Sequence, residues 1–396
     1  MIHFDPFDYG FHEDPYPIYE KLRAEAPLYH NEELGFWAFS RHADVLAGFK
    51  DTARLSNKQG ISLEMEDLGD HLELVLSILG MDPPKHGKMR GLVSKGFTPR
   101  RVAGLEPSIR ALASTYIDRF VEAGECEFVS EFAGRLPMDV VSEMLGVPQS
   151  DRDELRAQAD LVLHREEGVR GVPKSGVAAS GRLLAYFMEH IEGRKKKPGD
   201  DLASALLAVE VEGERLDERQ ILAFCYLMII AGNETTTKLL ANCLYWAEQN
   251  PAERDKLRGH PERISDWIEE TMRYDNSTQL MARTASAEIE THGETIKVGD
   301  KVLLLIGSAN RDLDVFPNAD RYDLDRDTSD HLSFGRGAHF CLGASLARLE
   351  ARVSLEEIER RLPDWRVNAA GAERVHNPNV RGFSKLPISF TPTPKR

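Results

Sequence analysis

Apolar residues recur with helical spacing through most of the middle of the chain. Glycines, prolines and short polar clusters separate these stretches and are expected to end the helices. The pattern predicts helices over residues 105–123, 137–145, 150–163, 177–191 and 201–209, and a long helix from Asp217 to about Gln249. Because successive helices follow one another with few strands between them, we expect a mainly α fold.

Both ends of the chain add short strands to this helical pattern. Alternation of apolar and polar residues predicts strands over residues 28–30, 36–40, 286–296 and 301–306, with helices over 15–26 and 43–49. His292 and Gly293 are expected to form a turn between two strands. We therefore expect a small β-rich lobe beside the helices. No stretch resembles a linker, so residues 1–396 are expected to form a single domain.

The composition of this 396-residue chain argues against several classes of protein. A net charge of −15 disfavours general affinity for nucleic acid. The longest apolar segment, about Leu222 to Gly232, is far shorter than the ~20 residues that cross a bilayer, and the N-terminus lacks the features of a signal peptide. The cysteines, Cys126, Cys225, Cys243 and Cys341, show neither paired nor zinc-like spacing. We expect a soluble, cytoplasmic protein.

A glycine-rich loop near the C-terminus, Phe334-Gly-Arg-Gly-Ala-His-Phe-Cys-Leu-Gly343, has the most restrictive pattern. An isolated cysteine such as Cys341 is usually a buried free thiol. Here Gly335 and Gly337 permit a tight turn with N–H groups aimed at the sulfur, and together with the following helix start these groups would keep the sulfur ionised. Such a thiolate is suited to be the axial ligand of a haem, because it pushes electron density onto the iron and favours O–O cleavage.

This loop resembles, at every fixed position, the haem-binding loop of the cytochrome P450 family, Phe-Gly-x-Gly-x-His-x-Cys-x-Gly. The resemblance implies the cytochrome P450 fold, with one haem b between a long central helix and the loop. Cys341 would ligate the iron, Phe334 would pack beside the ring, and Gly343 would let the next helix approach it. Other family motifs follow in order from His86, so the resemblance extends over essentially the whole chain.

The resemblance also assigns residues to the haem propionates. His86 and Arg90 are four residues apart and share one helix face, which in most proteins would be a solvated surface. A similar segment with the same His-x-x-x-Arg spacing runs beside the haem in the family and holds a propionate. Arg283 and His339 are expected, on the same resemblance, to bind propionates as well.

The segment from Ile221 to Asn242 is too uniformly apolar for a surface helix and is expected to cross the core. An abrupt polar insertion, Ala231-Gly-Asn-Glu-Thr-Thr-Thr237, lies in its middle. It would be costly there unless hydrogen-bonded or functional, and a structural kink is the plain alternative. The insertion is similar to the family's Ala/Gly-Gly-x-Asp/Glu-Thr motif. This implies that Ala231 borders the space for oxygen and that Glu234 and Thr235 deliver protons, with O2 as the oxidant.

Glu270 and Arg273 are three residues apart on a predicted helix and resemble the family's Glu-x-x-Arg element. Most such pairs are surface salt bridges of little energetic weight. In the family the pair is buried and locks the haem-binding core. We expect Arg321 to supply the third partner, with Arg326 as the alternative.

Apolar residues from several regions are candidates for substrate contact. Residues 56–80 form an irregular stretch that would be a core flap in most proteins and a lid beside a haem. Residues 164–176 resemble the family's mobile connection above the substrate, and Phe383 lies in a segment resembling its last substrate loop, although a core aromatic is also consistent. The candidates are Met65, Leu68, Leu76, Leu227, Ile230, Leu280, Met281 and Phe383. Their character predicts a fatty acid, steroid, terpenoid or polyketide.

The chain has no Gly-x-Gly-x-x-Gly motif and no second domain for a flavin. A bacterial, monomeric monooxygenase of this kind would hydroxylate or epoxidise its substrate with electrons from a separate ferredoxin and ferredoxin reductase. A basic docking patch is expected from Lys85, Lys88, Arg100, Arg101, Arg336, Arg348 and Arg352. The alternatives are a haem-binding sensor or carrier without turnover, and a peroxide-driven peroxygenase or an isomerase.

Overall fold

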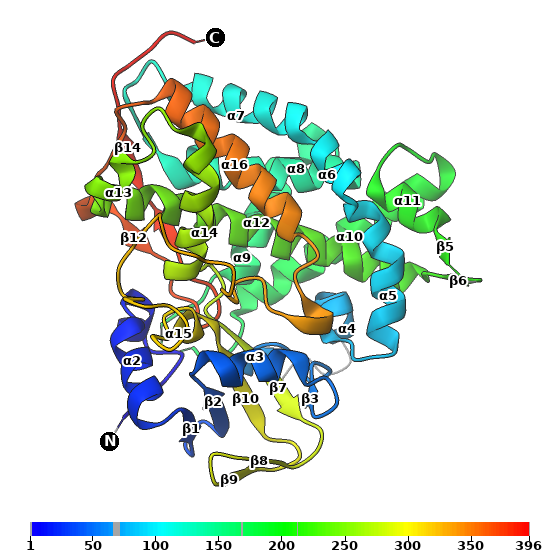
Figure 1. Cartoon of the computed structure of the whole chain (residues 1–396). Coiled ribbons are helices and arrows are strands. Elements are labelled where there is room, and N and C mark those ends of the chain that lie inside the picture. The colour runs from blue at the N-terminus through cyan, green and yellow to red at the C-terminus, as the bar shows by residue number, and fades with distance from the viewer. Residues whose placement is uncertain (1, 66–71, 168, 212, 396) are drawn as a thin grey trace.

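The computed structural model describes residues 2–65, 72–167, 169–211 and 213–395. Helices form most of the molecule, and a small sheet lies at one end of it (Figure 1). The predicted middle helices are present as α7 (Glu106–Phe120), α8 (Leu136–Leu145), α9 (Arg152–Leu163), α10 (Lys174–Lys196), α11 (Leu202–Ala208) and α12 (Glu218–Gln249). The expected mainly α fold with a small β-rich lobe is confirmed. No described helix is long and apolar enough to cross a membrane.

Further helices surround this group. They are α1 (Tyr9–Glu13), α2 (Tyr16–Glu25), α3 (His42–Lys50), α4 (Leu72–Leu76), α5 (Lys85–Val93), α6 (Pro99–Gly104), α13 (Pro251–Asp255), α14 (Ile264–Tyr274), α15 (Ile306–Ala309) and α16 (Ala344–Arg361). Short strands complete the described part of the chain: β4 (Glu125–Glu127), β5 (Glu210–Val211), β6 (Glu214–Arg215), β11 (Arg366–Val367), β12 (Glu373–Arg374), β13 (Phe383–Lys385) and β14 (Pro387–Ser389).

The main sheet joins strands from the N-terminal region to strands from residues 280–305. Its order is β1 (Leu28–Asn31), β2 (Phe36–Phe39), β10 (Lys301–Leu305), β7 (Leu280–Ala285) and β3 (Leu55–Ser56). β2 and β10 run parallel, and the other neighbours are antiparallel. The sequence did not predict β7, because nearly all of its residues are buried and alternation is lost. The expected turn at His292 and Gly293 is present between β8 (Ile289–Thr291) and β9 (Glu294–Ile296).

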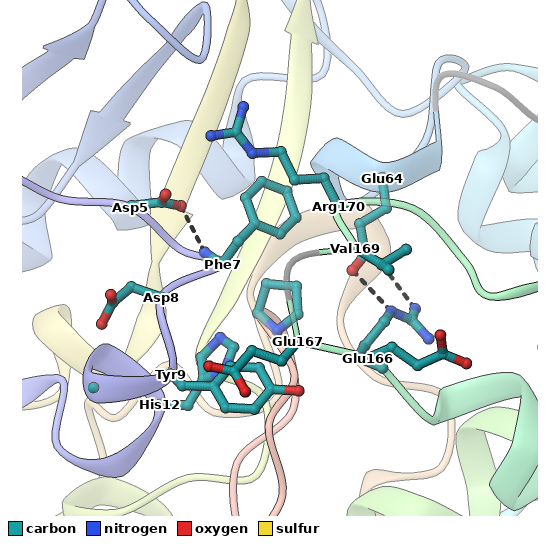
Figure 2. Close-up of a pocket in the computed structure, with 13 residues that line it drawn as sticks. Asp5, Phe7, Asp8, Tyr9, His12, Glu64, Glu166, Glu167, Val169 and Arg170 are labelled. Atoms are coloured by element: carbon teal, nitrogen blue, oxygen red, sulfur yellow. Dashed lines mark hydrogen bonds and ion pairs between the residues drawn. The ribbon is translucent and has the colours of Figure 1, made fainter.

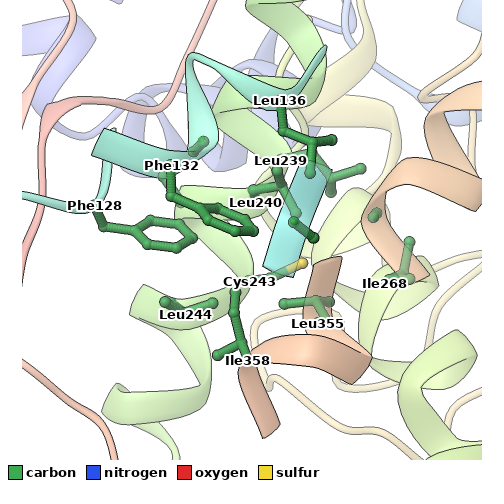
Figure 3. Packing of buried hydrophobic residues seen from close by; sticks show 14 of the residues in the cluster. Phe128, Phe132, Leu136, Leu239, Leu240, Cys243, Leu244, Ile268, Leu355 and Ile358 are labelled. Carbon is green, nitrogen blue, oxygen red and sulfur yellow. The ribbon is translucent and has the colours of Figure 1, made fainter. Parts of the chain in front are cut away.

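α12 is the central element of the helical region. Its first turn is closed by a capping box, in which Asp217 accepts from the Gln220 N–H and the Gln220 side chain accepts from the Asp217 N–H. The helix contacts α8, α10, α14 and α16, and it contributes to two hydrophobic clusters. Figure 3 shows one of them, where Leu240 and Leu244 meet Phe132 and Ile358. This packing on several sides fixes the position of the polar residues in the middle of the helix.

Glu270 and Arg273 form a fully buried bidentate ion pair on α14, with both nitrogen–oxygen distances 2.7 Å. The predicted third partner was wrong. The Arg321 side chain is exposed, and only its carbonyl accepts a hydrogen bond from Arg273. Arg326 approaches Glu270 at 3.4 Å instead, because the segment turns back at Asn318 and brings the later arginine over the pair.

Candidate active site

A cavity of about 270 Å³ lies between α12, α5, β7 and the loop that carries Cys341. Its walls are mostly apolar. The lining side chains include Phe49, Ile61, Ile78, Leu79, Phe97, Val141, Phe224, Leu227, Met228, Leu239, Met272, Met281, Ile306 and Leu346. Residues from the beginning, middle and end of the sequence therefore enclose one space, which suits an apolar ligand.

The loop around Cys341 has the predicted tight backbone. Gly335 and Gly337 have φ angles of +67° and +72°, and a Cβ on Gly337 would lie 2.9 Å from the Phe49 carbonyl oxygen. The N–H groups that lower the pKa of the Cys341 thiol belong to Gly343 and Ala344, at the start of α16, and not to the turn. Although Cys341 is exposed to the cavity, enclosure of its thiol by the surrounding protein has the larger effect and raises this pKa, so a bound metal ion would be needed to hold the sulfur fully as thiolate.

A set of nitrogen donors converges on the same cavity. His86, Arg90, Arg283 and His339 all line it. The His86 and His339 rings are 4.0 Å apart, and the Nδ1 atom of His339 is buried without a hydrogen-bond partner in the described chain. Burial lowers the pKa of His339 to about 3 and that of Arg283 to about 10. These groups are in a suitable position to receive anionic oxygens.

The donor set and the cavity together fit a haem. Arg283 is a buried guanidinium that donates to the neighbouring Ala282 carbonyl. A carboxylate, such as a haem propionate, would stabilise a buried charge of this kind. Nothing would meet a Cβ at Gly343 within 4 Å, so the wall beside Cys341 is open to a flat ring. Phe334 lines this wall, and the Arg348 guanidinium lies 4.5 Å from the centre of its ring.

The middle of α12 forms another part of the wall. Ala231, Gly232, Thr235 and Thr236 line the cavity. The Thr235 hydroxyl donates to the Ala231 carbonyl at 3.0 Å, which is the backbone bond expected for a helical threonine. Ser277, which the sequence did not single out, donates to the Thr235 carbonyl at 2.8 Å. The Thr235 hydroxyl is therefore bonded within its own helix, while Ser277 fixes the backbone carbonyl of the same residue.

Glu234 lies differently from its neighbour. It does not line this cavity, and its carboxylate forms an ion pair with the Lys238 ammonium, with a nitrogen–oxygen distance of 2.8 Å. Both side chains are largely buried, with exposed fractions of 13% for Glu234 and 5% for Lys238. The Lys238 ammonium also donates to the Phe383 carbonyl at 3.0 Å. The sequence motif thus brings Thr235 to the cavity and places Glu234 behind it.

A second acid, Glu350 on α16, lines the cavity and was missed by the sequence analysis. It is 1% exposed, its Oε1 atom has no partner in the described chain, and burial raises its pKa well above the ordinary value. Thr236 is its hydrogen-bond partner. The helical spacing could have indicated that Glu350 is buried, because it shares one helix face with the apolar residues Leu346 and Val353, which are buried.

The predicted substrate residues divide into two groups. Leu227 and Met281 line the cavity. Leu76, Ile230 and Leu280 pack in the core or beside it instead, and Met65 packs on Gly60. Leu68 lies outside the described residues. Leu280 does not line the cavity because it alternates with Met281 along β7, so the two side chains point to opposite faces of the strand.

Phe383 also lies away from the cavity. It is 2% exposed, its ring centre is 4.6 Å from that of Tyr245, and the Arg374 guanidinium lies 4.3 Å from it. The core alternative for this aromatic is therefore the one that the structure supports.

The expected basic patch is partly neutralised. Lys85 pairs with Glu73, Arg348 with Glu269, and Arg352 with Glu106 and Glu356. Lys88, Arg100 and Arg101 are exposed on α5 and α6, and Arg336 is half-buried. The guanidinium of Arg336 bonds to main-chain carbonyls of Gly335 and Ser329.

Comparisons with known proteins identify the family to which the chain belongs. A sequence model described as "Cytochrome P450" matches residues 182–362. "Putative cytochrome P450 123" of Mycobacterium tuberculosis is 52% identical over 386 residues, which cover 97% of this chain and 96% of the relative. "Cytochrome P450 109" of Bacillus spizizenii is 35% identical over 389 residues, covering 95% and 92%.

The solved structure of cytochrome P450 CYP109Q5 from Chondromyces apiculatus superposes with a TM-score of 0.91 at 34% identity, covering 99% of this chain and 100% of the other. CYP109E1 from Bacillus megaterium, solved in complex with testosterone, has a TM-score of 0.85 at 30% identity, covering 95% and 99%. Similarity at this level over nearly the whole length shows common descent and a common fold. The chain therefore belongs to the cytochrome P450 family, the haem-b-binding monooxygenases.

Proposed function

We propose that this cytochrome P450 inserts one atom of O2 into a hydrophobic small molecule, with Cys341 as the axial ligand of its haem and with electrons from a separate ferredoxin. The observation that carries the proposal is one cavity lined by Cys341 and Thr235, on which His86, Arg90, Arg283 and His339 converge. We further propose that residues 1–396 act as one cytoplasmic, monomeric domain. The free cysteines are in keeping with a reducing compartment.

Haem with a thiolate ligand supplies the activation of O2 that inserts oxygen into an unactivated C–H or C=C bond. The protein's own residues hold and orient this group. Arg90 and Arg283 supply guanidinium donors for the propionates, and His86 and His339 supply ring nitrogens. The N–H groups of Gly343 and Ala344 donate toward the Cys341 sulfur and set how strongly it releases electron density.

Protons must reach the oxygen side of the cavity for water to be released. We assign the inner proton donor to Thr235, whose hydroxyl donates to the Ala231 carbonyl and can turn toward the cavity that the residue lines. Glu234 is the acid behind it, paired with the Lys238 ammonium. In this arrangement Glu234 serves as the outer group of the relay and Thr235 as the inner one.

The substrate class follows from the wall composition. Leu227, Met228, Met281 and Ile306 provide apolar contact, while Ser277 and Thr278 are among the polar residues that line the cavity. A fatty acid, steroid, terpenoid or polyketide matches this wall. A solved complex of CYP109E1 with corticosterone and one of P450BioI with an acyl carrier protein bearing hexadec-9Z-enoic acid show that similar folds accept both rigid and extended apolar molecules.

The test is the absorption spectrum of the purified, dithionite-reduced protein with and without carbon monoxide. A strongly red-shifted Soret band that disappears in Cys341→Ser, while haem remains bound, would support the assignment. A spectrum typical of histidine ligation, or no haem band, would overturn it. NADPH-dependent product formation with a surrogate ferredoxin would then exclude a sensor or carrier, and absence of product with peroxide alone would exclude a peroxygenase.

A further inference from the structure

The positive charges that line the cavity around Cys341, called the haem cavity below, equal in number the negative charges of a haem. Among the residues that the structure describes, its cationic lining side chains are Arg90 and Arg283. His86 and His339 also line it, but burial lowers both pKa values, so their rings are neutral near pH 7. Haem b carries two propionates. A bound haem therefore neutralises both guanidinium groups and leaves no cation for a substrate.

The carboxyl group on the cavity wall does not favour an anion either. Glu350 is 1% exposed, and burial raises its pKa well above the ordinary value, so this group is neutral near pH 7. If it ionised, it would repel a negatively charged substrate.

Uncharged polar side chains on the wall are already engaged by the main chain. Asn57 donates to the Leu79 carbonyl at 2.9 Å, and Ser277 donates to the Thr235 carbonyl at 2.8 Å. The single hydroxyl hydrogen of Ser277 is thus directed away from a ligand. A buried carboxylate needs a cation or several N–H and O–H donors, and these residues do not provide such a set.

A basic residue beyond the cavity wall is also neutralised. Ile61 lines the haem cavity, and Glu64, three residues later, lines a separate outer pocket of about 590 Å³. Arg165 donates to both carboxylate oxygens of Glu64, at 2.8 and 2.7 Å, as the dashed lines at Glu64 in Figure 2 mark. This bidentate geometry occupies both sides of the interaction, so Arg165 is not available to a substrate carboxylate.

The other charges around the outer pocket are mostly negative. Arg170 is the further guanidinium in its described lining, and it lies 3.7 Å from Glu33. The further carboxylates, labelled in Figure 2, are Asp5, Asp8, Glu166 and Glu167. Residues 66–71 follow in sequence, and they comprise three acidic residues, one histidine and neither lysine nor arginine. The sequence after Ile61 therefore adds negative charge, and no spare cation.

We propose that the substrate of the haem cavity is an apolar molecule without negative charge: a neutral steroid, terpenoid or lactone, or an acyl chain whose carboxyl group is esterified. The inference rests on the proposed function and narrows its substrate class by excluding free carboxylates. Burying an unpaired carboxylate costs so much free energy that the group stays in water or takes up a proton instead. A free fatty acid should therefore bind weakly in spite of its apolar chain.

The experiment titrates the holoprotein with matched pairs that differ in charge, and follows the spin-state shift of the Soret band. The pairs are dodecanoic acid with dodecanamide, which are extended, and lithocholic acid with its amide, which are rigid. At about pH 8 we expect the amide of at least one pair to bind about tenfold more tightly than its acid, or better, equivalent to ~1.4 kcal/mol. The difference should narrow toward about pH 6, where more of the acid is protonated and neutral, while the affinity of the amide stays constant.

Met281→Lys adds a cation to the cavity wall at a half-buried position, with Met281→Gln as the matched control. The lysine should lower the dissociation constant of the acid several-fold, and the glutamine should keep the wild-type preference for the amide. Equal improvement in both variants, or no improvement with lysine, would overturn the explanation by missing counter-charge. If Met281→Lys does not fold, the pH dependence of the wild-type protein decides.

Equal or tighter binding of the acids at about pH 8, or binding of neither amide, would overturn the inference. The carbon monoxide spectrum tests the proposed function separately. A thiolate-type band together with tight binding of the acids would refute the neutral substrate and leave the proposed function intact. If that band is absent, the proposed function fails, and calorimetric titration with the same pairs still reports whether the protein prefers neutral ligands.

Discussion

The Lys238 ammonium lies 2.8 Å from the Glu234 carboxylate, one turn away on the same buried helix. The lysine reaches this position because Gly382 has no side chain: a Cβ there would lie 2.5 Å from the Lys238 Cβ. The pair ties α12 to the segment before Phe383, whose carbonyl accepts the second hydrogen bond. The acid that we propose for proton delivery is therefore held in place by a cation that the sequence motif itself does not include.

Lys238→Met should destabilise the protein by roughly 2–3 kcal/mol, because it leaves the Glu234 carboxylate and the Phe383 carbonyl without their donor. The methionine keeps most of the buried volume, so the loss is mainly electrostatic. The double variant Lys238→Met/Glu234→Gln should recover part of the loss. Urea unfolding followed by circular dichroism measures both, and equal stability of the single and double variants would contradict the coupling.

Arg326→Met should cost roughly 2–3 kcal/mol of unfolding free energy, because the guanidinium is the third member of the buried Glu270 network and also bonds to the Pro317 and Asn318 carbonyls. Arg321→Met is the matched control. Its side chain is exposed and it meets Arg273 through its main-chain carbonyl, which the substitution keeps, so a change within about 0.5 kcal/mol is expected. Chemical denaturation with simultaneous measurement of haem release compares the two variants. A larger loss of stability in Arg321→Met than in Arg326→Met would support Arg321 as the third partner of the Glu270–Arg273 pair.

The residues that sequence reasoning placed at the cavity share a property. Cys341, Thr235, His86 and Arg90 belong to local strings in which glycines or helical spacing fix the direction of the side chain. Their positions depend on a few neighbouring residues, which the sequence displays directly. The helices and the hairpin at His292 were predicted for the same reason.

The residues that were misplaced depend on distant contacts. Arg321 and Arg326 lie in one irregular segment, and the fold of that segment decides which of them faces Glu270. Leu280 and Met281 could be sorted only by knowing that they lie in a strand. Phe383 is directed by Tyr245 and Arg374, neither of which is its neighbour in sequence. These choices are made by tertiary packing.

Glu269 should make the stability of the protein depend on pH in acid. Burial raises the pKa of this carboxyl, but hydrogen bonds from Arg348 and His331 outweigh it and lower the pKa from 4.5 to about 2. The stabilisation is therefore present above pH 4.5 and is lost as the pH falls toward 2. Because Arg348 is 38% exposed, we expect only about 1–2 kcal/mol.

Glu269→Gln should lose this contribution, so that its deficit relative to wild type is largest near pH 6 and disappears near pH 2. Urea unfolding at a series of pH values measures the difference. Glu373→Gln, which removes a carboxylate from a half-exposed pair with Lys385, should show no comparable pH dependence. A Glu269→Gln deficit that is the same at every pH would contradict the prediction.

The ion pairs on the basic surface predict which arginines matter for ferredoxin. Arg100→Gln/Arg101→Gln removes exposed charge and should raise the ferredoxin concentration for half-maximal turnover by about threefold to tenfold at low salt. Arg352→Gln removes a guanidinium already engaged by Glu106 and Glu356, so its effect should be smaller. Steady-state turnover against ferredoxin concentration at two ionic strengths is the measurement. Equal effects, or effects independent of salt, would argue against docking by these residues.

Thr235→Ala should uncouple oxygen consumption from product formation. The substitution removes the protic group that α12 presents at this point of the cavity, while Ala is a better helix former and the Ser277 bond to the residue 235 carbonyl is retained, so the fold should be unaffected. We expect NADPH consumption to continue and the share of electrons recovered as hydrogen peroxide to rise several-fold. Thr235→Ser keeps the hydroxyl and should stay near wild type. The measurement is the amount of hydrogen peroxide formed per NADPH consumed, in the presence of a ligand that shifts the Soret band. If Thr235→Ala and Thr235→Ser both give the wild-type ratio, protons reach the cavity without Thr235.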